Sequence, residues 1–503
     1  MVKGRVQRQH PNGRNLFDAM STTKAMSTSQ AMRTAVDVLI VGAGLSGLIA
    51  ARRLQQQGKQ VRVLEARTRI GGRMVSRTLS DGSVVDLGGQ WGGGTHHRFA
   101  ALLQELGITS YPSFYSGNGV WCWLGQRVQA PLAEQFAESL LFFQPGALGL
   151  DAAELAATQA LQQAFAALVA QINPRQPWSS PNAEALDRLT VAQWAAQHTT
   201  LPLARLPLDW LCRVGGSGGF EPWETSILHL AWTQAVAPQA ESPESWLVHG
   251  GAGAVAQRLA ADLEAHSPGS LQLGAPVLAI EQHATGVAVK AQGGDPVQAK
   301  AVIVAVPPIQ RLAIQFEPPL PVGHQALLQR TAMGGMTKIL ALYARPFWRE
   351  QGLNGLGIGD QPWLELTADS GPPQGQPAVL ASFVAGERAI RLAAKPAAER
   401  RALILRDLVA YWGEQAGEPL ELVEQPWNQE AWTSGAFTSF PAPGCWTSHA
   451  RLAAGDEEGP GPASHGRVLW AGTEVSPRWP GYFEGAIEAG ERAAAAATTL
   501  ITP

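Results

Sequence analysis

Three glycines and one acid carry the clearest chemistry in this sequence. Gly42, Gly44 and Gly47 are spaced as G-x-G-x-x-G. In such a loop the first glycine permits a tight turn, the second lets the backbone approach a pyrophosphate, and the third lets the next helix pack closely on a sheet. Glu65 follows 18 residues after Gly47, where an acid that binds a ribose is expected. These four residues therefore predict a dinucleotide site.

The elements that would position these residues surround them in the sequence. The apolar run 36–41 predicts a buried parallel strand, residues 45–57 a helix, and residues 61–64 a second strand. The helix would aim its N-terminal N–H groups and the positive end of its dipole at the phosphates. Because strand, loop, helix and acid agree, we interpret the glycines as a dinucleotide site rather than as a turn of purely structural role.

The composition limits the class of protein and of partner. At about 150 residues per domain, a chain of 503 residues is expected to hold two to four domains. The net charge of −3 indicates no polyanionic partner, which argues against nucleic acid. The widely spaced Cys122, Cys212 and Cys445 predict buried free thiols rather than a metal site or a disulfide framework.

The N-terminal segment and the hydropathy pattern bear on location. Residues 1–35 are rich in basic and hydroxyl side chains and contain one acid, Asp18. They lack the apolar core of a secretory signal, so we expect a disordered segment, with a targeting role left open. No run of 18 apolar residues is present, which argues against a membrane-spanning helix. We therefore expect a soluble, cytoplasmic protein, and the sequence leaves a homodimer open.

The order of the predicted elements indicates two interleaved domains. Patterns typical of a nucleotide-binding domain occupy residues 36–115, 245–330 and 436–500. The second domain would consist of a mostly helical insertion at residues 116–244 and a second sheet within residues 331–435.

Two sets of strands are predicted within these segments. Short runs between residues 276 and 308 are expected to form a small antiparallel sheet closed by a buried strand. Residues 333–348 and 378–384 are expected to be strands of the second sheet.

Four separated motifs give the sequence its resemblance to a known family. They are VGAGLSGLIAA followed by LEARTRIGGR, VDLGGQWGG, MTKILALYARPFW, and AGTEVSPRWPGYFEGAIEAGERAA, and together they span residues 36 to about 498. With these motifs the chain resembles the flavin-dependent amine oxidases, the group that includes monoamine oxidases, polyamine oxidases and L-amino-acid oxidases. The resemblance implies an α/β fold with a Rossmann-like FAD-binding domain interleaved with a substrate domain of mixed sheet and helices.

The resemblance also implies how FAD is held. The glycine loop matches the pyrophosphate site, Glu65 the ribose site, and Val277 the residue whose backbone meets adenine. Ala436 stands where membrane-bound monoamine oxidases carry the cysteine that attaches FAD, and Cys445 does not match that position, so FAD is expected to be noncovalent. No metal is implied. The expected cofactor residues are Gly42, Gly44, Leu45, Ser46, Gly47, Glu65, Arg67, Gly72, Arg73, Gly89, Gln90, Trp91, Val277, Glu474 and Phe483.

Within this set, the resemblance places each group beside a part of FAD. Arg67 and Arg73 are implied beside the diphosphate and flavin, and the backbone of residues 89–91 is implied along the isoalloxazine. Glu474 is implied near the ribityl–phosphate region, with a surface carboxylate as the alternative. Phe483 is implied beside the pyrimidine ring.

Three further residues are implied in catalysis. Lys338 matches a lysine that holds a water near flavin N5, the alternative being a strand residue that points outward to solvent. Phe437 and Tyr482 match two aromatic residues that cage the amine, the alternative being ordinary core aromatics. The implied reaction is hydride transfer from a neutral primary amine to flavin N5, reduction of O2 to H2O2, and hydrolysis of the imine to an aldehyde and ammonia.

Several substrate classes remain open from the sequence. The low charge and the 17 tryptophans favour a primary amine with a hydrophobic or aromatic body. A flavin-dependent desaturase and a non-catalytic flavin-binding protein are alternatives from other classes, which peroxide release would separate from an oxidase.

Two of the open classes need charged partners in the site. An L-amino acid needs a cation for its carboxylate, and the candidates are Arg478 first, then Arg98, Arg213 and Arg345. A polyamine needs acids, and the candidates are Glu221, Glu224 and Glu241.

Overall fold

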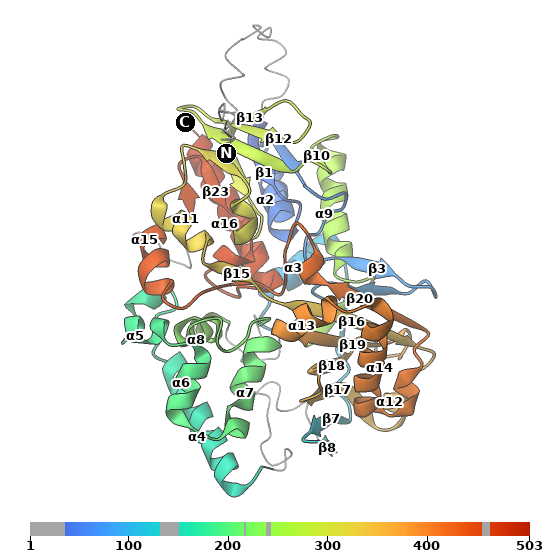
Figure 1. Ribbon diagram of the computed structural model, residues 1–503. Helices are drawn as coiled ribbons and strands as arrows, with labels where there is room; N and C mark the ends of the chain where they lie inside the picture. Colours follow the sequence, from blue (N-terminus) through green and yellow to red (C-terminus); the bar gives the residue numbers. More distant parts are fainter. Residues whose placement is uncertain (1–35, 131–149, 216–217, 238–242, 455–462, 503) are drawn as a thin grey trace, which may run out of the picture. The chain divides into compact units, whose positions relative to one another are not determined.

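The computed structural model describes residues 36–130, 150–215, 218–237, 243–454 and 463–502 (Figure 1). The expectation of disorder for residues 1–35 therefore falls outside the described residues. Within the described part, two large sheets and the helices packed on them make up most of the structure.

A sheet of nine strands, the first sheet, carries the glycine loop. The central strand β1 (Val36–Val41) is parallel to β2 (Val61–Leu64) and to β13 (Val297–Val304). On its other side β13 runs parallel to β23 (Val468–Trp470), so neighbouring strands come from distant parts of the chain. The other strands of this sheet are β10 (Leu271–Gln272), β11 (Val277–Gln282), β12 (Val287–Ala291), β14 (Gln315–Glu317) and β22 (Ser464–His465).

The antiparallel strands predicted between residues 276 and 308 form as expected, but they belong to the first sheet instead of making a small sheet of their own. β12 is antiparallel to both β11 and β13, and β13 also pairs with β1 and so joins all three to the first sheet. Residues 301–304 of β13 are fully buried. Consecutive apolar residues suit a strand that is covered on both faces, and such a strand belongs in the middle of a large sheet.

Four helices pack on or beside the first sheet. They are α2 (Leu45–Gln56), α3 (His97–Leu106), α9 (Gly253–His266) and α16 (Phe483–Ile501). The α2 and α16 helices approach closely where Gly490 faces Ser46. A Cβ atom on Gly490 would lie only 2.4 Å from the Ser46 carbonyl oxygen, so this contact requires glycine. The contact fixes the C-terminal helix against the helix that follows the glycine loop.

The second sheet has seven strands in the order β20-β16-β19-β18-β17-β7-β8. Its neighbours are antiparallel except for the parallel pair β17 and β7. Figure 1 shows α12 and α14 beside this sheet. The strands are β7 (Asn118–Trp123), β8 (Gln126–Ala130), β16 (Met336–Tyr343), β17 (Leu353–Gly359), β18 (Leu366–Asp369), β19 (Ala378–Ala385) and β20 (Glu421–Pro426).

The insertion predicted as mostly helical begins with two strands, so that prediction is wrong for residues 118–130. Val120, Trp121 and Trp123 are of types that favour strands, and all three are buried. Pairing with β17, more than 200 residues later in the chain, decides the structure here. The strand predicted over residues 333–348 is likewise too long, because β16 ends before Pro346 and residues 347–350 form a short helix.

Helices fill the rest of the insertion. Asp151 and Thr190 form capping boxes at the starts of α4 and α6, which explains why these helices begin where they do. The helices of the insertion are α4 (Ala152–Val169), α5 (Ala183–Arg188), α6 (Val191–His198), α7 (Pro202–Arg213) and α8 (Ile227–Val236).

The remaining elements are the helix α14 of 16 residues and shorter helices and strands. The helices are α10 (Pro308–Arg311), α11 (Val322–Leu328), α12 (Phe347–Glu350), α13 (Gly386–Ala393), α14 (Ala397–Trp412) and α15 (Arg451–Ala454). The strands are β3 (Ser76–Thr78), β4 (Val84–Asp86), β5 (Trp91–Gly92), β6 (Ser110–Pro112), β9 (Trp246–Val248), β15 (Thr331–Met333) and β21 (Ser439–Pro441).

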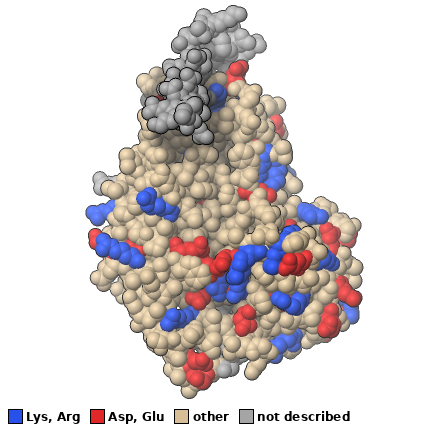
Figure 2. All heavy atoms as spheres, viewed as in Figure 1, with Lys and Arg blue, Asp and Glu red and all other residues tan. Residues whose placement is uncertain are grey.

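Surface charge and helix hydropathy agree with the composition. Figure 2 shows basic and acidic side chains interspersed over the described part of the face in view. Among the described residues, none of the helices combines the length and the apolar character needed to cross a bilayer.

Candidate functional site

The glycine loop has the geometry that its spacing predicts. Gly42 has a φ of +102°, a left-handed conformation that glycine adopts without strain. A Cβ on Gly47 would lie 2.0 Å from the Gly42 carbonyl oxygen, so the helix can pack on the loop only with glycine there. A Cβ on Gly44 would meet no protein atom within 4 Å, because Gly44 faces an open cavity. The loop therefore forms a cradle in which a ligand can approach the backbone.

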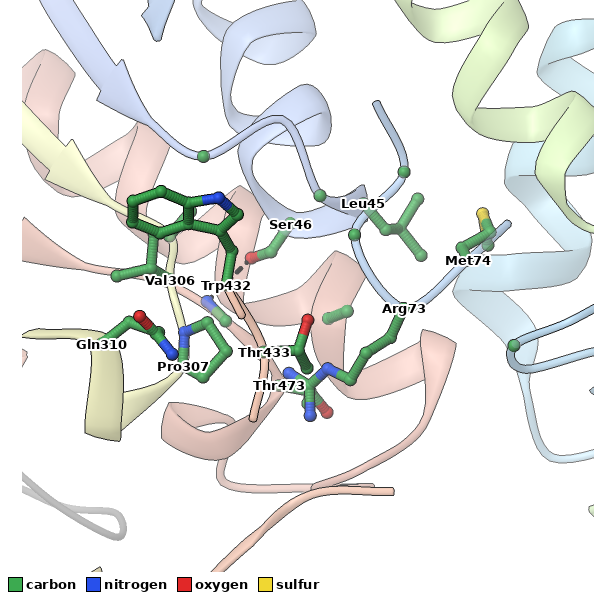
Figure 3. Close-up of a pocket in the computed structure, with 18 of the residues that line it drawn as sticks. Leu45, Ser46, Arg73, Met74, Val306, Pro307, Gln310, Trp432, Thr433 and Thr473 are labelled. Atoms are coloured by element: carbon green, nitrogen blue, oxygen red, sulfur yellow. Dashed lines mark hydrogen bonds between the residues drawn. The ribbon is translucent and has the colours of Figure 1, made fainter. Parts of the chain in front are cut away.

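This cavity, the main cavity, runs from the glycine loop to the second sheet. Figure 3 shows side chains from separate parts of the chain around it, among them Ser46, Arg73, Val306 and Trp432. The Ser46 hydroxyl accepts a hydrogen bond of 3.0 Å from the Gly472 N–H and so joins α2 to the C-terminal motif. The expected cofactor residues that line the cavity are Gly42, Gly44, Leu45, Ser46, Glu65, Arg67, Gly72, Arg73, Gly89, Val277 and Phe483.

Glu65 lies at the end of β2, beside the loop. Its carboxylate is buried and accepts hydrogen bonds from the Ala43 N–H at 2.7 Å and the Arg67 N–H at 2.9 Å. The acid is thus held by backbone donors at the edge of the cavity. This is the place where the sequence pattern predicts an acid that binds a ribose.

An arginine and residues that the sequence did not single out complete this end of the cavity. Arg67 pairs with Glu430 at 3.2 Å and hydrogen-bonds the Thr433 hydroxyl. Burial and the nearby Arg69 lower the pKa of Arg67 below its usual value. Trp432 and Thr433 line the cavity, although no motif around them points to a ligand.

Glu474 and Arg73 form a buried ion pair along the cavity wall. Their side chains approach to 2.7 Å, and Arg73 also donates to the Phe437 carbonyl oxygen at 2.7 Å. Burial by itself would raise the pKa of Glu474, but the Arg73 guanidinium more than offsets this, so the pKa lies below its usual value. The surface alternative for Glu474 is excluded by its burial. Glu474 acts on the main cavity through Arg73, since it does not line the cavity itself.

Lys338 lies in the middle of β16, between β19 and β20, and its side chain faces the main cavity. It is 2% exposed, which excludes an outward-pointing strand residue. Its ammonium donates to the Gly88 carbonyl oxygen at 2.8 Å and to Gln90 Oε1. Burial lowers the pKa of Lys338 to about 7, although Asp86 acts in the opposite direction.

Phe437 and Tyr482 both line the main cavity, as does Lys338. The ring of Phe437 packs edge-on against Phe383, with centroids 5.9 Å apart. The Tyr482 ring packs edge-on against Trp479 at 5.0 Å. Within the described residues, the buried Tyr482 hydroxyl has no hydrogen-bond partner. Burial raises the pKa of Tyr482 well above its usual value, so the hydroxyl stays protonated and can act as a donor.

The walls around these three residues are mainly apolar. The lining includes Met336, Phe383, Trp427 and Ala436. Of these residues, the sequence analysis considered only Ala436, for its place in the family motif. Alternation along strands could have indicated Met336 together with Lys338, but Phe383 and Trp427 require knowledge of the tertiary structure.

Like Glu474, the expected cofactor residues Gln90, Trp91 and Gly47 do not line the main cavity. Gln90 instead contacts Lys338 and Ser370. The ring of Trp91 lies 5.5 Å from the Lys338 ammonium, within the range of a cation–π contact. Gly47 contributes indirectly, because its lack of a side chain lets α2 pack against the glycine loop.

The four arginines considered for a substrate carboxylate are all paired with acids, and none of them lines the main cavity. Arg478, the first candidate, pairs with Glu488 at 2.6 Å. The others pair as Arg98 with Glu484, Glu488 and Glu491, Arg213 with Glu221 and Glu365, and Arg345 with Glu350.

The described acids considered for a polyamine also have partners outside the main cavity. Glu221 accepts from the Glu387 N–H at 2.9 Å, and Glu224 accepts from the Glu221 N–H at 2.7 Å. Neither lines the main cavity, and Glu241 falls outside the described residues.

The cysteines are also distant from the main cavity lining. Cys122, Cys212 and Cys445 are buried free thiols, as predicted, and none of them lines the cavity. Within the described ranges, no group of three or more His, Cys, Asp or Glu residues is arranged to hold a metal ion.

Comparison with known proteins gives consistent matches over almost the whole chain. A family model described as flavin containing amine oxidoreductase matches residues 45–498. An L-amino acid dehydrogenase of Synechocystis is 40% identical over 92% of this chain and 95% of that protein. A putative flavin-containing monoamine oxidase of Mycobacterium tuberculosis is 33% identical over 93% of this chain and 97% of that protein. A solved structure of putrescine oxidase bound to putrescine has a TM-score of 0.81 at 29% identity, covering 92% of this chain and 99% of that one.

Proposed function

Because this chain belongs to the family of flavin-containing amine oxidoreductases, we propose that it is an FAD-dependent oxidase of a primary amine with an apolar or aromatic body. In this proposal O2 is the electron acceptor, and the products are H2O2, an aldehyde and ammonia. The observation that carries the substrate class is the apolar, aromatic lining of the main cavity around Lys338. An aliphatic or aromatic body would bury its surface against Met336, Phe383 and Phe437.

The residues present fit FAD as the cofactor. The cradle at Gly44, the N-terminus of α2 and the acid Glu65 lie together at one end of the main cavity, and Lys338 lies toward the other. When bound, the flavin would supply the redox chemistry by accepting a hydride from the carbon that bears the amine. We infer noncovalent binding for two reasons. Ala436 lines the cavity at the position where the family resemblance would place an FAD-attaching cysteine, and no described cysteine lines the cavity.

The two proposed domains follow from the same arrangement. Residues 36–115, 245–330 and 436–500 would bind the cofactor, since they supply the glycine loop, Glu65 and Val277. Residues 116–244 and 331–435 would supply walls of the substrate site. Lys338 and Phe383, on adjacent strands of the second sheet, support this division.

Lys338 has two roles in this proposal. An ammonium has three N–H donors, and two of them are used by Gly88 and Gln90, which leaves the third for a water in the main cavity. Because its pKa is about 7, a large fraction of Lys338 is neutral at physiological pH. The neutral amine can then accept the proton that a substrate ammonium must lose before its carbon is oxidised.

Phe437 and Tyr482 would orient the substrate. Two rings that line the same part of the cavity restrict an amine to a narrow approach, and their electron-rich faces favour the nitrogen end. A closed, apolar environment also excludes water from the reacting carbon.

The test is a peroxide assay on the purified, FAD-loaded protein. The panel contains aromatic and aliphatic monoamines, diamines, polyamines and L-amino acids. We expect peroxide with monoamines. No peroxide from a yellow protein with any of these substrates would overturn the proposal and favour a desaturase or a non-catalytic flavin protein.

A second candidate function is oxidation of an L-amino acid. The observation that favours it is the Tyr482 hydroxyl, a buried donor without a partner among the described residues. Leaving such a donor unpaired costs about 1–3 kcal/mol, and a substrate carboxylate oxygen would satisfy it. The 40% identical relative is named an L-amino acid dehydrogenase, which supports the same candidate.

The two candidates differ in substrate and in acceptor. Reduction of an artificial electron acceptor by L-amino acids, with little peroxide and no reaction of monoamines, would select the second candidate. Peroxide from monoamines alone would select the first.

A further inference from the structure

Gln90, directly before β5, contacts Lys338 of β16. Its Oε1 accepts a hydrogen bond from the Lys338 ammonium, and Gln90 itself is 2% exposed. The Lys338 side chain has a single other hydrogen-bond acceptor among the described residues, the Gly88 carbonyl oxygen. Gln90 therefore supplies half of the hydrogen bonding that compensates a buried cation.

The Gln90 amide has two partners, Lys338 and Ser370. A glutamine amide has an oxygen that accepts and a nitrogen that donates, and the two ends have nearly the same shape. The Lys338 ammonium can only donate, so it selects the Gln90 oxygen. The Gln90 Nε2 then donates to the Ser370 hydroxyl oxygen at 2.8 Å, which holds the other end of the amide.

The Ser370 backbone is itself held by the neighbouring strand β19. Ser370 follows β18, and its N–H donates to the Val379 carbonyl oxygen at 2.9 Å. The chain of contacts thus links three separate segments, from β18 through Gln90 to β16. None of these contacts involves the glycine loop.

Among the described residues, Gln90 is the polar side chain that hydrogen-bonds to Lys338. The other side chains near the ammonium are aromatic rings and a more distant carboxylate. The rings of Trp91 and Phe383 lie 5.5 Å and 5.8 Å from the ammonium. Asp86 favours the charged form at longer range, but its carboxylate already accepts from the Ser76 hydroxyl and the Ala252 N–H.

Gln90 and Ser370 also line a second cavity, together with Tyr111 and His249, whereas Lys338 does not line it. This cavity offers about 350 Å³ to water-sized molecules, far more than the roughly 10–15 Å³ that one water needs. Gln90 therefore contacts Lys338 and also borders a space with room for solvent.

We propose that Gln90, held by Ser370, is the positioning residue that fixes the Lys338 side chain at the wall of the main cavity and stabilises its charged form. This rests on the role of Lys338 in the proposed function. Gln90 acts through Lys338 and has no contact with the substrate in this proposal. Removing its oxygen weakens the charged form of Lys338, and replacing its amide with a carboxylate strengthens it.

The test measures the titration of Lys338 directly. Holoenzyme with isotope-labelled lysine is titrated by NMR, and the Lys338 signal is assigned by its loss in Lys338→Met. We expect Gln90→Met to lower the pKa of Lys338 by at least one unit, a tenfold change in proton affinity, and Gln90→Glu to raise it by at least one unit. Ser370→Ala should shift it in the same direction as Gln90→Met but by less.

A matched control is Gln374→Met, because Gln374 lines the second cavity but makes no contact with Lys338. It should leave the titration unchanged. If Gln90→Met and Gln90→Glu both leave the pKa of Lys338 within 0.3 units (about twofold) of the parent, the proposal is overturned. Flavin absorbance of each variant confirms that the cofactor is still bound.

A kinetic measurement separates this proposal from the proposed function. The pH at which flavin reduction by amine reaches half its maximal rate should move down in Gln90→Met and up in Gln90→Glu. A purely structural role would lower the rates without moving this midpoint and would count against positioning. If no amine reduces the flavin, the proposed function fails, while the NMR titration still decides the role of Gln90.

Discussion

The buried hydroxyl of Tyr482 distinguishes the two candidate substrate classes at the scale of one atom. Tyr482→Phe keeps the ring and removes only the donor. If the substrate is a monoamine, the variant should retain kcat/KM within about threefold, because the hydroxyl has no hydrogen-bond partner to lose among the described residues. If the substrate is an L-amino acid, kcat/KM should fall about tenfold or more, because a carboxylate loses a buried hydrogen bond.

Tyr343→Phe is the matched control for this substitution. Tyr343 is also buried, but its hydroxyl donates to Ala416 in the second sheet region, away from the main cavity. Its substitution should lower stability without changing substrate preference. Equal effects of both substitutions on kcat/KM would indicate that Tyr482 acts only through stability.

Lys338 predicts a pH dependence of stability with a definite sign. Burial lowers its pKa from the usual 10.5 to about 7. Between these values the unfolded chain binds a proton that the folded protein does not hold, so the contribution of Lys338 to stability increases as pH rises. Below about pH 7 both states are charged, and the full cost of burying the ammonium applies.

Lys338→Met removes this titration. Between pH 7 and pH 9.5 the wild-type protein should gain roughly 3 kcal/mol of unfolding free energy relative to Lys338→Met, measured by chemical denaturation of the two proteins at both pH values. Lys300→Met is the control, since Lys300 is exposed and pairs with Asp37. A constant difference between wild type and Lys338→Met across this range would contradict the burial of a titrating amine.

At the scale of elements, two substitutions in the glycine loop and α2 should distinguish an effect on folding from an effect on cofactor binding. Gly47→Ala would place a Cβ 2.0 Å from the Gly42 carbonyl oxygen, so α2 must shift and the apoprotein should lose several degrees of Tm. Gly44→Ala meets no protein atom and has an ordinary φ of −73°, so the apoprotein should keep its Tm.

The same pair of variants should differ in the opposite way toward FAD. The Gly44→Ala methyl group projects into the main cavity, and the Kd for FAD should rise tenfold or more. Quenching of flavin fluorescence measures the Kd, and thermal unfolding of the apoprotein measures the stability. Unchanged FAD affinity in Gly44→Ala would place the cofactor elsewhere.

What could be predicted from the sequence depends on how local the determinant is. The loop, α2 and Glu65 follow one another along the chain, so spacing was sufficient to predict them. β7 could not be predicted, because its partner β17 lies far along the chain, and β8 pairs in turn with β7. Gln90 is assigned to the cofactor by its neighbours in the motif, but its side chain hydrogen-bonds to Lys338 and Ser370.

At the scale of the whole molecule, both sheets contribute to the wall of the main cavity. A ligand that binds only the folded state stabilises it by RT ln(1 + [L]/Kd), which is about 2.7 kcal/mol at a hundredfold excess over Kd. Added FAD should therefore raise the Tm of the apoprotein, and the unfolding of the two sheets should become more cooperative. A Tm that does not depend on FAD concentration would contradict binding in this cavity.

The same cavity predicts how the cofactor is released. None of the described cysteines lines it, so precipitation with acid should free the yellow flavin into the supernatant. Trypsin digestion of the pellet followed by absorbance at flavin wavelengths provides the check. Flavin retained on a peptide would contradict noncovalent binding.

The strand order of the first sheet has a consequence for how the protein is made. One neighbour of β1 is β2, which follows it closely in the chain. Its other neighbour is β13, which comes more than 200 residues later, and β13 also pairs with β23 near the C-terminal end of the sequence. During synthesis β1 therefore leaves the ribosome long before its edge can be covered. Such non-local pairing slows folding and leaves apolar strand edges open to other nascent chains. The yield of active protein should accordingly depend on chaperones and on the rate of translation more than its final stability would suggest.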